Sequence, residues 1–421
     1  MPDRQTAYEF LLLVVLVSAL TFAAAWIFPI WDDGRLMLAI QDFGSAAIWT
    51  NFGNRPLAAL FYSFLLNHNL FVPVAVVLHF VGWLGMGWVT RGLWRLSFPS
   101  YANVALLPAI LSVAPILCKM QTVLLTLVTI DLIPPLLVFA ALFILVREYR
   151  QRWQKVLLGA LAFALIVVAV LISEYSVVAA GVAMVFLAGN AARGSPERKR
   201  EYRVTAGLIA ACAVVSYLVF LRLTKGSGRD AFRPSYIKES FSLRIPFRLL
   251  SGIWRGILGG LLQSLGSITL HSKVALLSFV CGCVFSLLVV LALRKQSVEV
   301  KLELDKRVVI TLFAATILAL IPVVLMDRTL ESRWDSRFWL PALPVLSCLS
   351  VYLLLYLVRS RLQLLIVIVC GFLGGYWTTW EVANALRNGE TVATLIQEVP
   401  GQEFYPRISK HTVNIVHGDT R

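Results

Sequence analysis

Residues 9–29 read EFLLLVVLVSALTFAAAWIFP, an apolar run with a single acidic residue, at its first position. About 20 mostly apolar residues are enough for an α-helix to cross the hydrocarbon core of a membrane. Similar runs recur along all 421 residues of the chain, which is 59% hydrophobic and only 14% charged. Soluble domains carry about 25% charged residues, so the composition excludes a soluble enzyme, a disordered chain and a disulfide-rich secreted domain. We therefore predict an all-α, polytopic membrane protein.

The apolar runs predict eleven transmembrane helices, which together form one transmembrane domain over residues 1–380. The run 175–190 is short, so residues 156–190 could form one bent hairpin instead of two full crossings. A short tail, 381–421, follows the last span. The predicted spans are 9–29, 70–90, 102–118, 120–146, 156–173, 175–190, 204–222, 274–293, 308–325, 339–358 and 362–380.

Basic residues in the short loops predict the orientation of the chain, because Lys and Arg concentrate on the cytoplasmic side of membrane proteins. The N-terminus and every second loop after it carry 19 of the 38 Lys and Arg residues. We therefore expect a multi-pass membrane protein with the N-terminus in the cytoplasm and the tail outside. The main external loops are then 30–69, 223–273 and 326–338, and any chemistry is expected there.

The first external loop opens with Trp31-Asp32-Asp33-Gly34-Arg35. Two adjacent carboxylates directly after a span could simply be a solvated helix end. They could also supply a general base, because removing a proton from a hydroxyl group requires a positioned carboxylate. We take Asp32 and Asp33 as the candidate catalytic residues and Arg35 as a supporting polar residue.

Two interfacial helices are predicted in the external loops. The first covers 36–49 and ends at Trp49, an aromatic residue of the kind that anchors at membrane interfaces. The second, 244–262, carries its arginines on one face and apolar residues on the other, which suits either plain lipid anchoring or a substrate contact. Between them, Arg55 precedes Pro56, a residue favoured in the first turn of a helix.

Ionisable residues within or beside the spans are candidate functional residues, because a charge is costly in hydrocarbon. Asp131 lies roughly eleven residues, or about 16 Å, into the fourth predicted span; its alternative role is a buried structural hydrogen bond. Glu174 and Lys119 lie at external turns between spans, where water could equally explain them. The short loop 326–338 contains Arg333 and Arg337, which suggest an anionic partner such as phosphate.

The order of these residues resembles the GT-C class of integral-membrane glycosyltransferases, which use polyprenyl-phosphate-linked sugars. The stretch Asp32-Asp33-x-Arg35, followed by Trp49-x-Asn51-x-x-Asn54-Arg55-Pro56-Leu57, is most similar to the serotype-converting O-antigen glucosyltransferases. This chain reads Phe-Gly-Asn-Arg-Pro where that type has Asn-Gly-Arg-Pro. Weaker similarities follow in the same order, at Pro115 through Pro134, at Leu158 through Tyr175 and at Ser336 through Pro344.

The resemblance implies transfer of a sugar from a polyprenyl-phosphate donor to a hydroxyl of a cell-envelope glycan or lipid on the outer face. It implies a location in the bacterial inner membrane and a carboxylate base. We take Asp32 as the base and Asp33 as its helper, or as a metal contact if a divalent cation takes part; the reverse order of these two adjacent acids stays open. Other residues take two further roles. Arg337 would bind the donor phosphate with help from Arg55, Arg333 and Lys119, while Arg35, Asp131 and Glu174 would give polar support.

Two other classes of protein remain alternatives. A lipid or solute transporter would show internal repeats and broken helices meeting at mid-membrane, and the sequence shows no clear repeat. An O-antigen polymerase or ligase would share the lipid-linked substrate and the external arginines. In every case the expected partners are membrane lipids and lipid-linked glycans, and we expect no nucleic acid.

Overall fold

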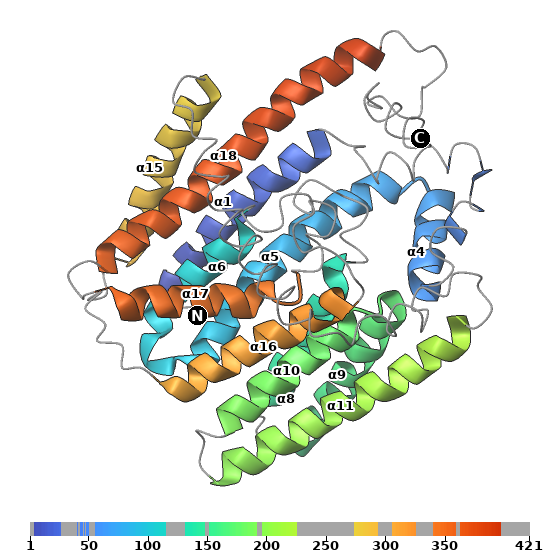
Figure 1. Ribbon diagram of the computed structural model, residues 1–421. Coiled ribbons are helices and arrows are strands. Elements are labelled where there is room, and N and C mark those ends of the chain that lie inside the picture. The colour runs from blue at the N-terminus through green and yellow to red at the C-terminus, as the bar shows by residue number, and fades with distance from the viewer. Residues whose placement is uncertain are drawn as a thin grey trace.

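The computed structural model describes residues 4–26, 55–114, 131–147, 151–191, 196–224, 273–293, 305–325, 340–358 and 363–396, together with single positions between 40 and 49. Every element in these ranges is a helix (Figure 1). In chain order the helices are α1 (Arg4–Trp26), α4 (Pro56–Asn67), α5 (Phe71–Ser97), the 3-10 helix η1 (Pro99–Val104), α6 (Leu106–Val113), α8 (Ile133–Val146), α9 (Arg152–Ile172), α10 (Ser176–Ala191), α11 (Pro196–Thr224), α15 (Lys273–Leu293), α16 (Lys306–Leu325), α17 (Leu343–Leu357) and α18 (Gln363–Ile396).

The chain is an all-helical, multi-pass membrane protein. Each of the eleven predicted spans overlaps one of the described helices, and six of these helices are long and apolar enough to cross a membrane. Four shorter apolar helices, α4, α8, α10 and α17, have between 10 and 17 residues. The number of complete crossings therefore stays a prediction. The six long segments are Thr6–Trp26, Phe71–Ser97, Trp153–Ile172, Glu197–Leu223, Lys273–Leu293 and Gln363–Trp380.

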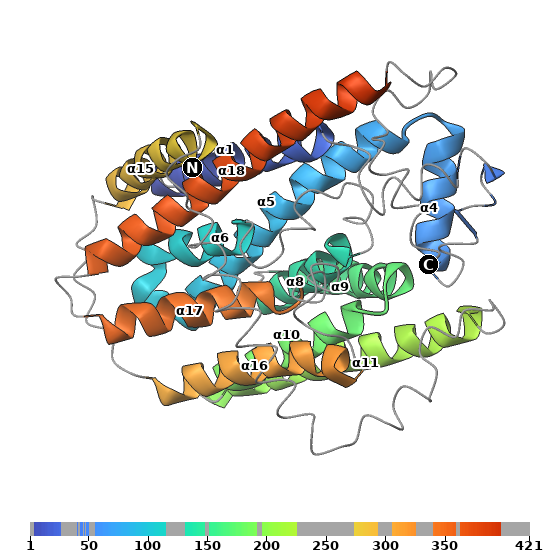
Figure 2. The same ribbon diagram turned by 45° about the horizontal axis from the view of Figure 1, so that its top comes forward.

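The helices form two neighbouring groups, with α5 and α17 between them (Figures 1 and 2). In one group, α1 and α15 pack against α18, and α6 contacts α1, α5, α17 and α18. In the other, α10 packs mainly against α11 and α16, while α9 packs mainly against α8 and α11. The predicted segment 156–190 is thus two helices, α9 and α10, joined by the turn at residues 173–175; both contact α8 and α11.

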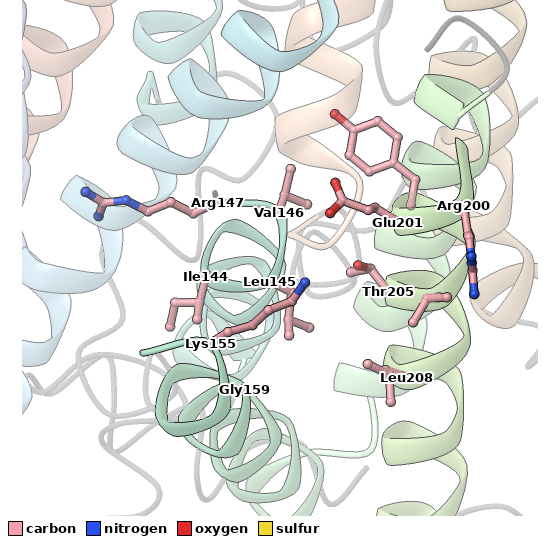
Figure 3. A pocket seen from close by; sticks show the side chains of 12 residues that line it. Ile144, Leu145, Val146, Arg147, Lys155, Gly159, Arg200, Glu201, Thr205 and Leu208 are labelled. Carbon is pink, nitrogen blue, oxygen red and sulfur yellow. The ribbon is translucent and has the colours of Figure 1, made fainter. Parts of the chain in front are cut away.

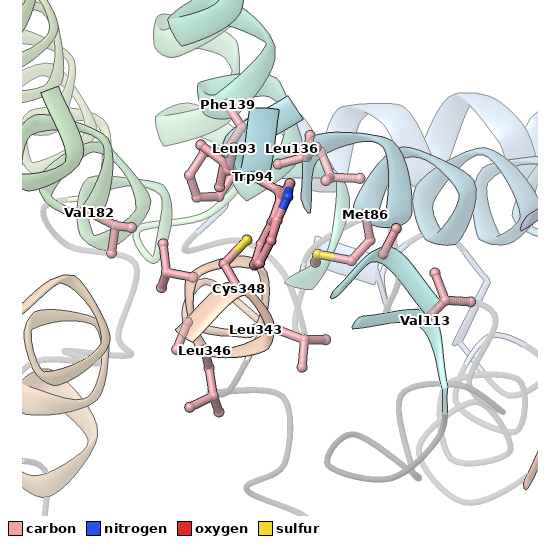
Figure 4. Packing of buried hydrophobic residues seen from close by; sticks show 14 of the residues in the cluster. Met86, Leu93, Trp94, Val113, Leu136, Phe139, Val182, Leu343, Leu346 and Cys348 are labelled. Atoms are coloured by element: carbon pink, nitrogen blue, oxygen red, sulfur yellow. The ribbon is translucent and has the colours of Figure 1, made fainter. Parts of the chain in front are cut away.

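The core between the two groups of helices consists mainly of buried apolar side chains. Trp94 of α5, Phe139 of α8 and Cys348 of α17 are fully buried and meet where the groups join (Figure 4). The indole Nε1 of Trp94 donates a hydrogen bond to the carbonyl of Tyr101 at 2.7 Å, so this buried polar atom is satisfied. A single packed cluster therefore ties α5, α8 and α17 together.

Glycines allow α15 and α18 to approach closely. A methyl group added at Gly371 would lie 2.9 Å from the Cα of Ser286, and one at Gly375 would lie 3.1 Å from the Cα of Gly282. The Ser286 hydroxyl also donates a hydrogen bond across this interface, to the carbonyl of Ile368 at 2.9 Å. Small residues spaced four apart, with a polar bond beside them, are a common way for helices to pair inside a membrane.

Two sets of contacts give the directions of neighbouring helices. On α5, Gly85 faces Leu136 and Gly92 faces Phe143, so α5 and α8 run in the same direction. On α10, Gly181 and Gly189 face the later and the earlier parts of α16, so these two helices are antiparallel. Both directions match the alternation of spans predicted from the sequence.

Helix α18 is longer than predicted. It continues from the apolar segment Gln363–Trp380 to Ile396, so the tail 381–421 begins as helix. The apolar segment ends at Trp380 because the residues after it are more polar. The helix continues because Ala, Leu, Arg and Glu in that stretch are good helix formers.

Candidate functional site

Three of the nine candidate residues lie in the part of the chain that the structure describes, and one of them interacts electrostatically with the other two. They are Arg55, Asp131 and Glu174. The predicted helix 244–262 lies outside the described residues, and so do the other six candidates: Asp32, Asp33, Arg35, Lys119, Arg333 and Arg337.

A two-pronged ion pair joins Arg55 to Glu174 across 119 positions of sequence. Arg55 Nε donates to Glu174 Oε2 at 3.1 Å, and Arg55 Nη2 donates to Glu174 Oε1 at 3.0 Å. The side chains are 16% and 6% exposed. Sequence alone allowed Glu174 to be a solvated helix end, whereas the structure shows a buried carboxylate paired with a guanidinium.

Local backbone structure holds both partners in place. Arg55 is the residue before Pro56, where α4 begins as predicted, and its carbonyl accepts the first helical hydrogen bond, from Ala59 at 2.9 Å. Glu174 lies in the tight turn between α9 and α10. There the amide of Ser176 bonds to the carbonyl of Ser173 at 3.0 Å, and the Ser176 hydroxyl bonds to the carbonyl of Ala169 at 2.9 Å. The pair is therefore fixed by two helix ends.

Asp131 is a second, weaker electrostatic partner of Arg55. Burial opposes the charge on Arg55, but the carboxylate of Glu174, with a further contribution from Asp131, raises the pKa of Arg55 above its ordinary value. Arg55 is thus firmly cationic. Asp131 itself is buried, at 7% exposure.

Asp131 lies two residues before α8, which begins at Ile133. Pro134 and Pro135 stand in the first turn of that helix, where a missing backbone N–H is tolerated. The eleven residues of the fourth predicted span that precede Asp131 lie outside the described part of the chain, so its depth in that span stays a prediction.

An apolar cluster beside the ion pair collects the ends of several helices. Ala24 near the end of α1, Tyr62 of α4 and Phe71 at the start of α5 are buried together, and Ile172 at the end of α9 packs against them. Ile40 and Ile48, from the first predicted interfacial helix, belong to the same cluster. The end of α1, which leads to Asp32 and Asp33, therefore lies on the same side of the molecule as the Arg55–Glu174 pair.

A second ionic cluster lies at the other ends of α1 and α5, and sequence reasoning missed it. Glu9 is fully buried and pairs with Arg91 Nε, while Arg95 Nη2 lies 3.6 Å from the same carboxylate. Arg91 also donates to the Thr6 hydroxyl at 3.1 Å, and its guanidinium lies 4.6 Å from the ring of Trp88. Arg91 and Arg95 were expected in a cytoplasmic loop, but α5 continues through both of them.

The signal for this second cluster was present in the sequence. Glu9 is the single acid in the first apolar run, and an acid in a span requires a cationic partner. Glu9 belongs to α1, and both arginines belong to α5. The cluster therefore acts as a clamp that holds these two helices together.

Among the described residues, no group of three His, Cys, Asp or Glu side chains converges on a position that could hold a metal ion. Asp32 and Asp33, the expected contacts of a divalent cation, lie outside this part of the chain. No protein family, curated protein or solved structure matches the chain. Chemically, the site offers a buried guanidinium that Glu174 holds in place, on the side of the bundle where α1 ends.

Proposed function

We propose that this chain is a membrane glycosyltransferase, which moves a sugar from a polyprenyl-phosphate donor to a hydroxyl of a cell-envelope glycan or lipid on the outer face of the membrane. The observation that carries the proposal is the ion pair of Arg55 with Glu174, with Asp131 as a second electrostatic partner of Arg55. These residues were singled out from three distant segments by their charge, and they belong to one end of the helix bundle. The sequence resemblance around Asp32 and Arg55 supplies the reaction class.

The cluster defines a role for Arg55. Its bonds to Glu174 use one hydrogen on Nε and one on Nη2, so the hydrogens on Nη1 remain for an oxygen of a substrate. Glu174 fixes the plane of the guanidinium, and a fixed planar fork suits a phosphate. Arg55 is therefore a positioning donor for the phosphate of the polyprenyl donor.

Arg55 is not expected to bind the phosphate alone, because Glu174 and Asp131 already offset its charge. Further cations are needed to attract a phosphate, and Arg337, Arg333 and Lys119 are the candidates on the same predicted face. Arg337 remains our first choice, and a divalent cation held by Asp32 and Asp33 could serve the same purpose.

The proposed reaction is a single inverting displacement. The acceptor oxygen forms a bond to the anomeric carbon while the bond from that carbon to the phosphate oxygen breaks. Asp32 takes the proton of the acceptor hydroxyl, with Asp33 as its helper. The polyprenyl phosphate leaves with the bonding electrons, and the cations stabilise the negative charge that develops on its oxygen.

The test uses Asp32→Asn and Asp33→Asn in purified full-length protein, with polyprenyl-phosphate glucose as donor and an envelope lipid extract as acceptor. Asn cannot accept the proton, so Asp32→Asn is expected to lower transfer by about 10²–10⁴-fold while the protein still folds. Glu197→Gln is the matched control, because Glu197 is an exposed acid in the first turn of α11. Near-full activity of both Asp variants would refute the mechanism. If the protein instead moves the donor across the membrane of proteoliposomes without transferring the sugar, the transporter alternative is favoured.

A further inference from the structure

A pocket lies at the end of the bundle opposite the Arg55–Glu174 pair. Its volume is about 500 Å³, and it opens between the last turn of α8, the first turns of α9 and the first half of α11 (Figure 3). Lys155 lines this pocket, and Glu174 follows the other end of the same helix. The 19 positions between them correspond to about 28 Å along a helix. The pocket is therefore separate from the proposed glycosyltransferase site.

The polar lining of this α8–α9–α11 pocket is mainly basic. Arg147, Lys155 and Arg200 line it together with a single acid, Glu201, which gives a formal charge of +2. Figure 3 shows Arg147 and Lys155 on one side and Glu201 and Thr205 across from them. All four charged side chains are exposed, so they can rearrange around an incoming anion.

The rest of the lining is apolar and continuous with the outer surface of the bundle. Val204 and Leu208 of α11 line the pocket and are 56% and 51% exposed. On a helix that crosses a membrane, such exposed apolar side chains face the acyl chains of lipid. Gly159 of α9 forms part of the wall, and a methyl group added there would meet nothing within 4 Å. The pocket therefore joins a basic rim to an open apolar wall.

We propose that the α8–α9–α11 pocket binds the headgroup of an anionic phospholipid, whose acyl chains lie along Val204 and Leu208. The basic rim matches a lipid phosphate, and the apolar wall has no role for a small soluble anion. Basic pockets between transmembrane helices on the cytoplasmic side commonly hold anionic headgroups. The distribution of basic loops predicts that this end of the bundle is the cytoplasmic one.

The test measures which lipids stay bound to the full-length protein in detergent, by native mass spectrometry with equal amounts of phosphatidylglycerol and phosphatidylcholine. The wild-type protein is expected to retain phosphatidylglycerol preferentially. Arg147→Gln and Lys155→Gln are each expected to lower this preference about fivefold, which corresponds to one basic residue near an anionic headgroup. Arg203→Gln is the charge control, because Arg203 is exposed on the same helix but does not line the pocket.

A second pair of variants changes the space without changing the charge. Gly159→Leu adds a side chain to the pocket and is expected to reduce phosphatidylglycerol binding. Gly207→Leu on α11 is its control, because Gly207 also has open space around it but does not line the pocket. The proposal is wrong if phosphatidylglycerol shows no preference, or if Arg203→Gln reduces it as much as Lys155→Gln does. It is also wrong if inorganic phosphate displaces the lipid, since the site would then be one for a free anion.

Discussion

Replacing either residue of the Arg55–Glu174 pair is expected to lower the free energy of unfolding, and the two replacements are expected to lower it by different amounts. Each charge-assisted hydrogen bond of the pair contributes about 1.5–3 kcal/mol, and the two bonds measure 3.0 and 3.1 Å. Glu174→Gln removes the bonded carboxylate but keeps the electrostatic attraction between Arg55 and Asp131. Arg55→Gln takes the bonded cation away from the buried carboxylate of Glu174. We expect losses in unfolding free energy of about 2–3 kcal/mol for Glu174→Gln and about 3–5 kcal/mol for Arg55→Gln.

The measurement is denaturant unfolding of the purified protein in detergent micelles, for both single variants and for the double variant. Because the two side chains act on each other directly, the double variant should lose at least about 1 kcal/mol less than the sum of the single losses. The loss in Arg55→Gln should also shrink at lower pH. A buried carboxylate without its cation has a raised folded-state pKa, so it takes up a proton and the penalty is relieved as the pH falls.

Two results would refute this reasoning. Single losses that add within about 0.5 kcal/mol would show that the side chains do not interact in the folded protein. A larger loss for Glu174→Gln than for Arg55→Gln would show that Asp131 does not contribute to holding the guanidinium.

Three further predictions concern the rest of the bundle. Glu9→Gln should lower the unfolding free energy by about 3–5 kcal/mol, because it leaves Arg91 buried without its carboxylate; a loss below about 1 kcal/mol in denaturant unfolding would contradict the clamp. Gly375→Val should separate α15 from α18 and lower the melting temperature, whereas Gly207→Ala, in open space, should not lower it. A topology reporter fused after Arg421 should be active only outside the cytoplasm, and a cytoplasmic signal would show that one span is miscounted.

The sequence predicted the positions of the helices well, because a membrane imposes a long apolar run on every segment that crosses it. All eleven predicted spans overlap described helices. The boundaries were less predictable. Hydropathy ended the second span before Arg91, but α5 continues to Ser97, because an arginine that pairs with Glu9 can remain inside a helix at this depth. Hydropathy includes the cost of burying the charge of Arg91, but it does not include the ion pair with Glu9 that offsets this cost.

The candidate site was predictable residue by residue but not as an arrangement. Charge near a span was enough to select Arg55, Asp131 and Glu174, and Pro56 correctly predicted where α4 begins. Nothing in periodicity links positions 55 and 174, because their contact depends on how α4 packs against the end of α9. The double proline after Asp131 was a local signal for the start of α8 at Ile133.

The two ionic clusters differ in how their charges are paired. At one end, Arg91 and Arg95 of α5 both lie beside the carboxylate of Glu9 of α1, so the contacts hold these two helices together. At the other end, Arg55 makes both of its ionic hydrogen bonds to one carboxylate, that of Glu174, and this pair joins the start of α4 to the turn between α9 and α10. In the proposed glycosyltransferase, the Nη1 hydrogens of Arg55 would meet an oxygen of the donor phosphate, and the external arginines would supply the further positive charge that stabilises the leaving group.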